Sequence, residues 1–432
     1  MKSSKCHIMA IMLLIPFLMF ANGQNEKKSN SKPTVITFGS HQSGLPSSGI
    51  VQEIAKEYEK ETGIKIEFQI VPDAQWRDLL KVKLNAGEAP DIFCADADPF
   101  SLYDRIRPDI NCVDVTNEEF TSRMDKSVLP GISYNGSVYG ITFPGPKIWY
   151  YFYNKEIFNN LGLEAPTSYA EFKAVSQKIK DAGITPVYEA LQNGWHQVLP
   201  LFETGPYYEE LEPGLYDKLN NNKMNVRKLA KLEEIITQLN EFAQLGFYGD
   251  DFMSNSVEGD FEAIANGEAA MVLEGYGWGQ QLMQDYPEMK GKLGFFVMPW
   301  GDNQTIGINP GSNAYFANKR SENAQAALDF FAYLAKPENL EKRLAGDPQA
   351  LNICWPEASS KMPPEYSAYY DAHKKGNVMQ YGVKYIDTQW MDVGQDLEAM
   401  YVGAMTPADV MDSISRRRDE QATIQKDPAW VK

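Results

Sequence analysis

The sequence predicts an α/β fold with two domains, in which a parallel sheet carries helices on its faces. Two observations predict this fold. Short apolar strands alternate with amphipathic helices early in the chain, an order typical of parallel sheets. The chain also has 432 residues, which is too long for a single hydrophobic core.

The early alternation contains five elements. Apolar residues at helical spacing from Ile50 to Tyr58 predict a helix that ends at Gly63, because glycine readily adopts the left-handed conformation found at helix ends. Apolar and polar residues alternate from Ile64 to Ile70, which predicts a strand. The full order is a strand at Val35 to Phe38, this helix, this strand, a helix at Trp76 to Ala86 closed by Gly87, and a strand at Asp91 to Ala95.

The pattern changes between Tyr139 and Asn154. Pro144, Gly145 and Pro146 separate two strand-like stretches there, so we expect the chain to pass from one domain to the other. The elements expected afterwards are a helix from the capping box Ser168 to Glu171 up to Gly183, a strand at Pro186 to Glu189, helices at Lys228 to Gln244 and Val257 to Ala265, strands at Ala269 to Glu274 and Leu293 to Met298, and helices at Asn323 to Leu334, Val393 to Val402 and Pro407 to Arg417.

The order of these elements predicts that the chain crosses between two lobes more than once. The expected crossings lie near Pro144, Pro299 and Leu351. Two lobes joined by several chain segments form a hinge around a cleft that can close. The predicted N-lobe contains residues 34–144 and 299–350, and the predicted C-lobe contains residues 145–298 and 351–432.

The N-terminus is expected to direct export. Basic residues precede an apolar run from Ile8 to Ala21, and Ala21 and Gly23 offer a cleavage site. An uncleaved membrane anchor is the alternative, but the run is shorter than the ~20 apolar residues of a spanning helix, and Pro16 interrupts it. Residues 1–23 are therefore predicted to be a signal peptide, and the polar residues 24–33 a disordered leader.

Cysteine positions bear on anchoring and on disulfides. Cys6 lies before the apolar run, and no cysteine follows it where a lipid could be attached. We therefore expect a mature protein without a membrane span that diffuses in the periplasm. After cleavage Cys94, Cys112 and Cys354 remain, an odd number, so at most one disulfide can form within the chain.

Composition excludes two classes of function. The formal net charge of -17 argues against nucleic acid as the main ligand, because that affinity rests on basic side chains that neutralise phosphates. The four histidines form no HExxH motif and no paired spacing, so we expect no metal site and no cofactor. Several tryptophans instead lie in loop-like contexts where a core would not need them, which favours a ligand-binding role.

Four segments carry a resemblance to a known family. In this order and spacing they resemble the extracellular solute-binding proteins of ABC importers, in particular the carbohydrate-binding group (family 1) that includes maltose-binding protein. The resemblance implies a two-lobed periplasmic-binding-protein fold (type II) of doubly wound sheets, a ligand held between the lobes, an ABC permease as partner, no cofactor and no chemistry on the ligand. We also expect a monomer. The segments are PDIF at Pro90 to Phe93, YGI and YNKEIFNNLGLEAPTSYAEF between Tyr139 and Phe172, NGEAAMVLEGYGW at Asn266 to Trp278, and the run from Trp390 through GAMTPADVM at Gly403 to Met411.

Aromatic rings are the first candidates for ligand contact, because sugars stack C–H faces on rings and bond their hydroxyls to carboxylates and amides. Trp278 lies in GYGWG, where glycines flank the ring, and the family commonly stacks sugar at this position. A core tryptophan that caps the sheet is the alternative. Tyr276 is a second candidate. The third glycine comes too early for a dinucleotide-binding loop.

Charged candidates follow the third strand and the first crossing. Asp96 and Asp98 lie at the edge where open α/β sheets bind ligands, and Asp98 matches the family's acidic sugar-binding position. Asp96 could instead cap the following helix. Lys147 replaces an acidic ligand-binding residue of maltose-binding protein, which argues against maltose-like recognition and leaves an acidic sugar open.

The remaining candidates come from loops. Trp195 and His196 lie in NGWHQ, where a cleft wall and a hydrophobic plug are both open interpretations. The glycine-rich stretch Gly307 to Tyr315 is expected to be a loop that leads into a helix. In the family such a loop offers backbone N–H groups and side-chain amides to the ligand. The other candidates are Gln42, Trp149, Asn309, Ser312, Asn313, Trp355 and Trp390, of which Trp390 aligns with a family stacking position.

Two other functions stay open besides capture of a mono- or oligosaccharide for a permease. A secreted glycoside hydrolase would use the same rings and carboxylates, but catalytic pairs face each other across the bond, whereas Asp96 and Asp98 are only two positions apart. A binding protein for another solute, such as a polyamine, would use ring faces and acidic groups to hold a cation.

Overall fold

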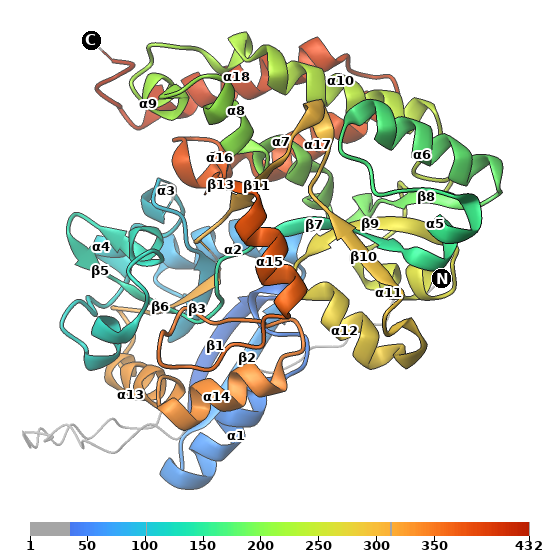
Figure 1. Ribbon diagram of the computed structural model, residues 1–432. Coiled ribbons are helices and arrows are strands. Elements are labelled where there is room, and N and C mark those ends of the chain that lie inside the picture. Colours follow the sequence, from blue (N-terminus) through green and yellow to red (C-terminus); the bar gives the residue numbers. More distant parts are fainter. Residues whose placement is uncertain (1–34, 101, 312, 432) are drawn as a thin grey trace, which may run out of the picture. The chain divides into compact units, whose positions relative to one another are not determined.

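In the computed structural model, two β-sheets organise the residues that the structure describes, namely 35–100, 102–311 and 313–431 (Figure 1). The predicted signal peptide and leader, and the candidate Ser312, lie outside the described residues. Within the described ranges, no helix is both long and apolar enough to span a membrane.

The first sheet has five strands in the order β2-β1-β3-β12-β6. β1 (Val35–His41) pairs in parallel with β2 (Lys65–Val71) and with β3 (Ile92–Asp96), which confirms the predicted parallel pairing. Between these strands the chain forms α1 (Ile50–Thr62) and α2 (Asp73–Ala86). The glycines that end both helices adopt positive φ, 76° at Gly63 and 75° at Gly87, as expected for helix-ending glycines.

One strand of this sheet was not expected. β12 (Asn313–Ala317) lies between β3 and β6 (Gly140–Thr142) and runs antiparallel to both. The prediction that the stretch Gly307 to Tyr315 opens before a helix is therefore wrong. Its end enters the sheet because residues 314–317 are apolar and buried there.

The second sheet has the order β10-β7-β9-β8. β8 (Thr185–Tyr188) runs parallel to β9 (Ala269–Gly275), whereas β7 (Trp149–Asn154) pairs antiparallel with β9 and with β10 (Leu293–Phe296). Residues 269–273 of β9 form a continuous buried run, which is typical of a central strand.

Helices and two short strand pairs complete the fold (Figure 1). Ser168 caps α6 by accepting a hydrogen bond from the N–H of Glu171 at 3.3 Å, as the sequence predicted. The further helices are α3 (Leu102–Ile106), α4 (Pro108–Asn111), α5 (Lys155–Leu161), α6 (Tyr169–Asp181), α7 (Leu199–Phe202), α8 (Gly205–Leu211), α9 (Leu215–Asn220), α10 (Ala230–Gln244), α11 (Asp260–Ala265), α12 (Trp278–Asp285), α13 (Ala324–Leu334), α14 (Pro337–Gly346), α15 (Pro364–Ala372), α16 (Met379–Gly382), α17 (Trp390–Tyr401) and α18 (Pro407–Ile424). The strand pairs are β11 (Thr305–Ile308) with β13 (Lys374–Asn377) and β4 (Ser133–Tyr134) with β5 (Ser137–Val138).

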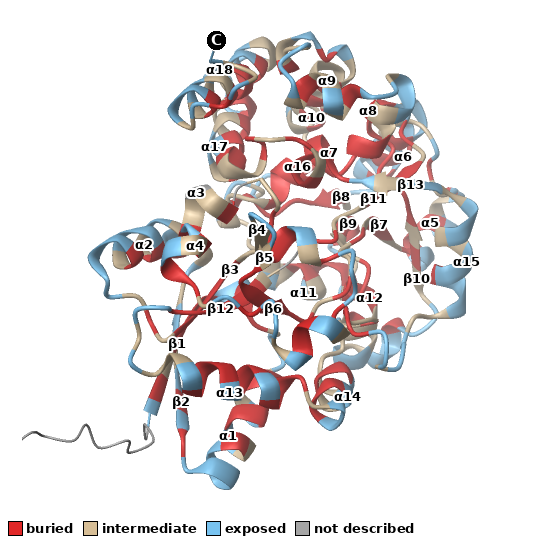
Figure 2. Cartoon of the chain, turned by 90° about the vertical axis from the view of Figure 1, so that its left-hand side faces the viewer, coloured by how far each residue is buried: buried red, intermediate tan, exposed pale blue. Residues whose placement is uncertain are grey.

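Burial follows the two sheets. Figure 2 shows most central strands and the helix faces toward them as buried, with exposed residues on the outer helix faces and loops. One core surrounds the first sheet, and two further cores lie on the faces of the second, because alternate residues of β7 such as Tyr151 and Phe152 enter different cores. Each sheet thus has its own apolar core, as two lobes require.

Two tryptophans lie across the expected lobe limits. Trp300 packs in a core of the second sheet, although residues 299–350 were expected in the N-lobe. Trp355 packs in the core of the first sheet, although residues 351–432 were expected in the C-lobe. Single-residue lobe boundaries stay a prediction.

Candidate ligand-binding site

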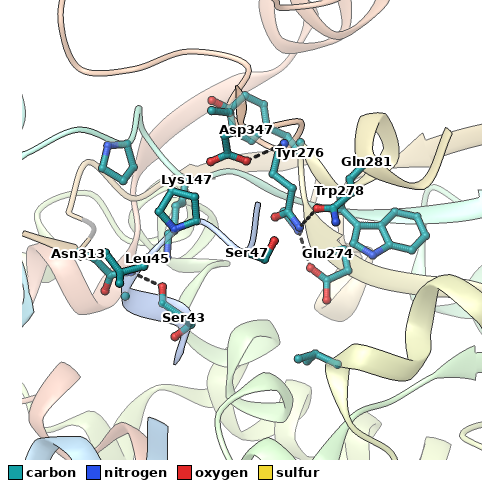
Figure 3. A pocket seen from close by; sticks show the side chains of 18 of the residues that line it. Ser43, Leu45, Ser47, Lys147, Glu274, Tyr276, Trp278, Gln281, Asn313 and Asp347 are labelled. Atoms are coloured by element: carbon teal, nitrogen blue, oxygen red, sulfur yellow. Dashed lines mark hydrogen bonds between the residues drawn. The ribbon is translucent and has the colours of Figure 1, made fainter. Parts of the chain in front are cut away.

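A cavity of about 490 Å³ takes its lining from segments around both sheets, and we call it the larger cavity (Figure 3). Figure 3 shows Ser43, Lys147 and Asn313 on one side and Tyr276 and Trp278 on the other. A second cavity of about 180 Å³, the smaller cavity, shares part of this lining. The shared residues are Ser43, Asp73, Lys147, Trp149, Trp195 and Asn313.

The turn from β9 to α12 forms one wall of the larger cavity. Trp278 begins α12 and donates its indole N–H to Asp260 Oδ2 at 2.9 Å, and its ring stacks on Phe261 with centroids 5.2 Å apart. These contacts leave the Trp278 side chain 2% exposed, so it supports the wall and offers little ring surface. Tyr276 also lines the larger cavity.

Trp149 and Trp195 line both cavities. Trp149 begins β7, and Trp195 precedes the short 3-10 helix His196–Val198. Their ring centroids lie 5.9 Å apart, and both side chains are partly exposed. Trp390 lines the smaller cavity and donates its indole N–H to the Trp195 carbonyl at 2.9 Å. Three tryptophans from distant parts of the sequence thus form a connected aromatic wall.

Amides and a lysine face this wall. Lys147 and Asn309 form a backbone β-bridge, and Asn313 donates its side-chain N–H to the Ser43 carbonyl at 2.6 Å. Within the described ranges, the Lys147 ammonium makes no ion pair or hydrogen bond. Gln42 lines the larger cavity.

Asp96, at the end of β3, lies between two guanidinium groups beside the smaller cavity. Its Oδ2 accepts from Arg77 and from Arg105, each at 2.9 Å. Burial alone would raise the pKa of Asp96, but the two arginines hold it below its usual range. Arg105 also forms an ion pair with Asp387. Asp96 is therefore an ionised carboxylate whose charge is already compensated.

His196 lies behind the wall and lines neither cavity. Nδ1 approaches Glu189 Oε1 and Nε2 approaches the Leu273 carbonyl, both at 2.7 Å. Two acceptors require both ring nitrogens to carry protons. Burial lowers the pKa of His196, yet Glu189 and Glu274 raise it to about 9. This imidazolium fixes the loop that carries Trp195.

Two other candidates lie outside both linings. Asp98 is 4% exposed, and its Oδ1 accepts from the N–H of Phe100 at 2.9 Å, which stabilises the turn after β3. Trp355 is 1% exposed and donates to the Thr142 carbonyl at 3.0 Å in the core of the first sheet.

Comparison with known proteins decides the family. The sequence profile of the bacterial extracellular solute-binding proteins matches residues 43–341. The chain belongs to this family. Among curated relatives, the arabinooligosaccharide-binding protein of Bacillus subtilis is 26% identical over 390 residues, which cover 87% of this chain and 86% of that protein. The multiple sugar-binding protein of Streptococcus mutans is 23% identical, over 82% and 85% of the two chains.

Solved structures of similar proteins show the same fold. A chitin oligosaccharide binding protein matches with a TM-score of 0.74 at 16% identity and covers 90% of this chain and 98% of its own. The solute-binding protein RafE, in complex with raffinose, matches with a TM-score of 0.68 at 17% identity, over 92% and 100% of the chains. The expected fold class, the two-lobed type II fold, is confirmed.

In this solute-binding protein, several cavity residues carried no signal in the sequence. Glu203 and Gln380 are examples: Glu203 directly follows α7, Gln380 lies in the one-turn helix α16, and they reach the smaller cavity only through packing between distant segments. No cluster of His, Cys, Asp and Glu suited to a metal occurs in the described ranges, and Cys94, Cys112 and Cys354 are free thiols. The other unpredicted lining residues that carry charge are Asp73, Arg77, Glu258, Asp260, Glu274, Arg343, Asp347 and Asp387.

Proposed function

We propose that this protein is the periplasmic substrate-binding component of an ABC importer and captures a mono- or oligosaccharide in the larger cavity. The lobes close on the sugar, and the closed form delivers it to the permease. The protein acts as a monomer and performs no chemistry on its ligand.

The observation that carries this proposal is the pairing of rings with amides around the two adjoining cavities. Trp149, Trp195 and Asn313 line both cavities, and Asn309 lines the smaller one. Covering ~50–100 Å² of apolar surface on each ring contributes on the order of 1–3 kcal/mol, which is enough to decide sugar affinity. The family membership supports capture of a sugar, and so do the relatives, which are named as sugar-binding proteins.

The charges of the cavities disfavour a glycosidase. A glycosidase needs one carboxylic acid and one carboxylate on opposite sides of the bond. Asp96 instead binds two arginines, and Asp260 lies beside Glu274, where burial and that neighbour raise its pKa. For a polyamine, the carboxylates of Asp96 and Asp387 already have arginine partners. The larger cavity also contains Asp73, Glu258 and Asp347, which form no ion pair among the described residues, so polyamines belong in the ligand screen.

A thermal-shift screen tests the proposal. The purified mature protein would be heated with neutral oligosaccharides, uronates and polyamines. A sugar at 100 times its Kd adds about 2.7 kcal/mol of stability, which raises the melting temperature. A shift with spermidine but with no carbohydrate would overturn the proposal, as would hydrolysis of any stabilising oligosaccharide.

A further inference from the structure

Tyr385 has a left-handed backbone conformation that is uncommon for a bulky side chain. Its φ is 63°, whereas left-handed positions usually carry glycine or asparagine. The residue lies in the segment 383–389 between α16 and α17, which we call the α16–α17 loop. A costly conformation persists only where the surrounding structure enforces it, so the contacts of this loop show what enforces it.

The α16–α17 loop leads residues to the smaller cavity. Gln380 precedes the loop, Asp387 belongs to it, and Trp390 begins the helix that follows it. All three residues line the smaller cavity, and Trp390 is also bonded to the aromatic wall through the Trp195 carbonyl. The shape of the loop therefore determines where Trp390 lies relative to this cavity.

The C-terminal segment 425–431 holds the loop from behind. Oδ2 of Asp427 accepts hydrogen bonds from the Tyr385 hydroxyl at 2.9 Å and from Lys384 Nζ at 2.8 Å. Its Oδ1 accepts from the N–H of Ala429 at 2.9 Å, so both oxygens of this 5% exposed residue have partners. Burial raises the pKa of Asp427, but these three donors hold it below its usual range. The carboxyl is therefore ionised at neutral pH.

α18 holds the same loop through two arginines. Arg418 is 2% exposed and donates its Nε–H to the Lys384 carbonyl at 3.0 Å. Arg417 donates its Nε–H to Oε1 of Gln389 at 3.2 Å, and Gln389 donates its amide N–H to the Tyr385 carbonyl at 2.7 Å. Hydrogen bonds thus connect α18 with both ends of the strained part of the loop.

The C-terminal segment is itself attached to α18, and it lies beside α9 and α18 (Figure 1). Trp430 donates its indole N–H to Asp419 Oδ1 at 2.8 Å, and the Arg418 guanidinium lies over its ring at 4.8 Å from the centroid. Asp427 and α18 therefore form one continuous support for the loop.

We propose that Asp427 is a positioning residue for ligand binding, which acts through Tyr385 and the α16–α17 loop on Trp390. Without the bond to Asp427, the Tyr385 backbone relaxes out of the left-handed region, the loop changes shape, and Trp390 moves. Asp427 lines neither cavity, so its effect on affinity is indirect. The inference rests on the proposed function and adds to it a dependence on the C-terminal segment.

Isothermal titration with arabinotriose, raffinose and chitotriose measures the effect on affinity. Asp427→Ala removes the shared acceptor of Tyr385 and Lys384, and Tyr385→Phe removes only the hydroxyl; we call these two the loop variants. Each folded loop variant should bind the tightest of these sugars about fivefold more weakly than the wild type, or weaker still, because the binding conformation of the loop is no longer enforced.

A second carboxylate in the core of the second sheet provides matched controls. Glu241 accepts from the Tyr169 hydroxyl and forms an ion pair with Lys173, as Asp427 does with its own tyrosine and lysine. Neither Glu241 nor Tyr169 lines a cavity. Glu241→Ala and Tyr169→Phe should bind within about twofold of the wild type, even where the melting temperature falls, because sites without shared partners act independently.

Fluorine NMR of protein labelled with fluorotryptophan reports the position of Trp390 without any ligand. The chain has eight tryptophans, and Trp390→Phe assigns the resonance. This resonance should shift or broaden in both loop variants and stay unchanged in both controls. A loss of stability alone would not change the spectrum of the folded protein in this way.

The outcomes distinguish the positioning role from the wider function. Wild-type affinity or an unchanged Trp390 resonance in the folded loop variants would overturn the role of Asp427 and leave carbohydrate capture standing. Equal losses of affinity in the loop variants and the controls would do the same. A wild type that binds none of the three sugars would contradict carbohydrate capture, while a displaced Trp390 resonance in the loop variants would still support the positioning by Asp427. If Asp427→Ala does not fold, Tyr385→Phe carries the same expected changes.

Discussion

The backbone carbonyl of Gln349 lies against Gly277, so close that a Cβ on this glycine would be 1.8 Å from the oxygen. Gly277 belongs to the turn between β9 and α12, and Gln349 follows α14 beside the first sheet; both line the larger cavity. The φ of Gly277 is -83°, which any residue adopts, so close approach and not backbone conformation explains the glycine.

Gly277→Ala should therefore push the turn and the chain at Gln349 apart. We expect the free energy of unfolding to fall by about 1–3 kcal/mol, as for an overpacked core, and sugar affinity to fall with it, because the turn carries Tyr276 and Trp278. Thermal melts and titrations measure both effects. Gly275→Ala is the matched control, since no atom lies within 4 Å of its added Cβ. Equal unfolding free energies and equal sugar affinities in the two variants would refute the close approach of Gln349 to Gly277 as the reason for this glycine.

The aromatic wall should dominate sugar affinity. Trp149→Ala and Trp195→Ala each remove a partly exposed ring from both cavities, and each should weaken binding roughly 10-fold to 100-fold, which corresponds to about 1.4–2.7 kcal/mol. Trp355→Phe is the control, because it changes a buried tryptophan that lines neither cavity. Affinities are measured by titration with the best-binding sugar. Equal losses of affinity in Trp355→Phe and Trp149→Ala would contradict the role of the aromatic wall.

His196 should stay doubly protonated at pH 8. Its folded-state pKa of about 9 exceeds the unfolded value of about 6.5, so its stabilising contribution is complete below pH ~6.5 and is lost as the pH rises through ~9. Ring ¹⁵N chemical shifts measure the protonation directly. In melts between pH 6.5 and 9.5, His196→Gln should lose less stability than the wild type. A neutral His196 ring at pH 7 would contradict the account.

Ligand should shift the two lobes toward a closed form. A sugar that bridges both lobes favours closure only by its higher affinity for that state. Small-angle X-ray scattering should show a smaller radius of gyration with saturating sugar than without it. The same comparison with a sugar that causes no thermal shift is the control. An unchanged radius at full occupancy would rule out closure.

Local patterns were enough to predict most of the fold. The helix Ile50–Thr62 and the strand Lys65–Val71 follow from periodicity and from the glycine at the helix end, which act within a few residues. β12 was missed because its short apolar run follows a glycine-rich stretch, and only pairing with distant β3 and β6 makes it a strand. Long-range pairing leaves no such local signature.

The candidate site, too, could be predicted only in part from local sequence patterns. Trp278 was expected to be accessible because glycines flank it, but Gly277 instead accommodates Gln349, and the ring packs on Phe261. Glu203 carried no signal in the sequence, because it comes to the smaller cavity together with Gln380, which lies far along the chain. Single residues in turns can be recognised as candidates, whereas their exposure and partners depend on tertiary packing. The ligand roles of all candidates stay predictions.

A crystal structure grown with the tightest-binding neutral oligosaccharide tests carbohydrate capture most directly. The account predicts sugar density in the larger cavity against Trp149 and Trp195. Density for the sugar at any other surface, with both cavities free of it, would contradict the account.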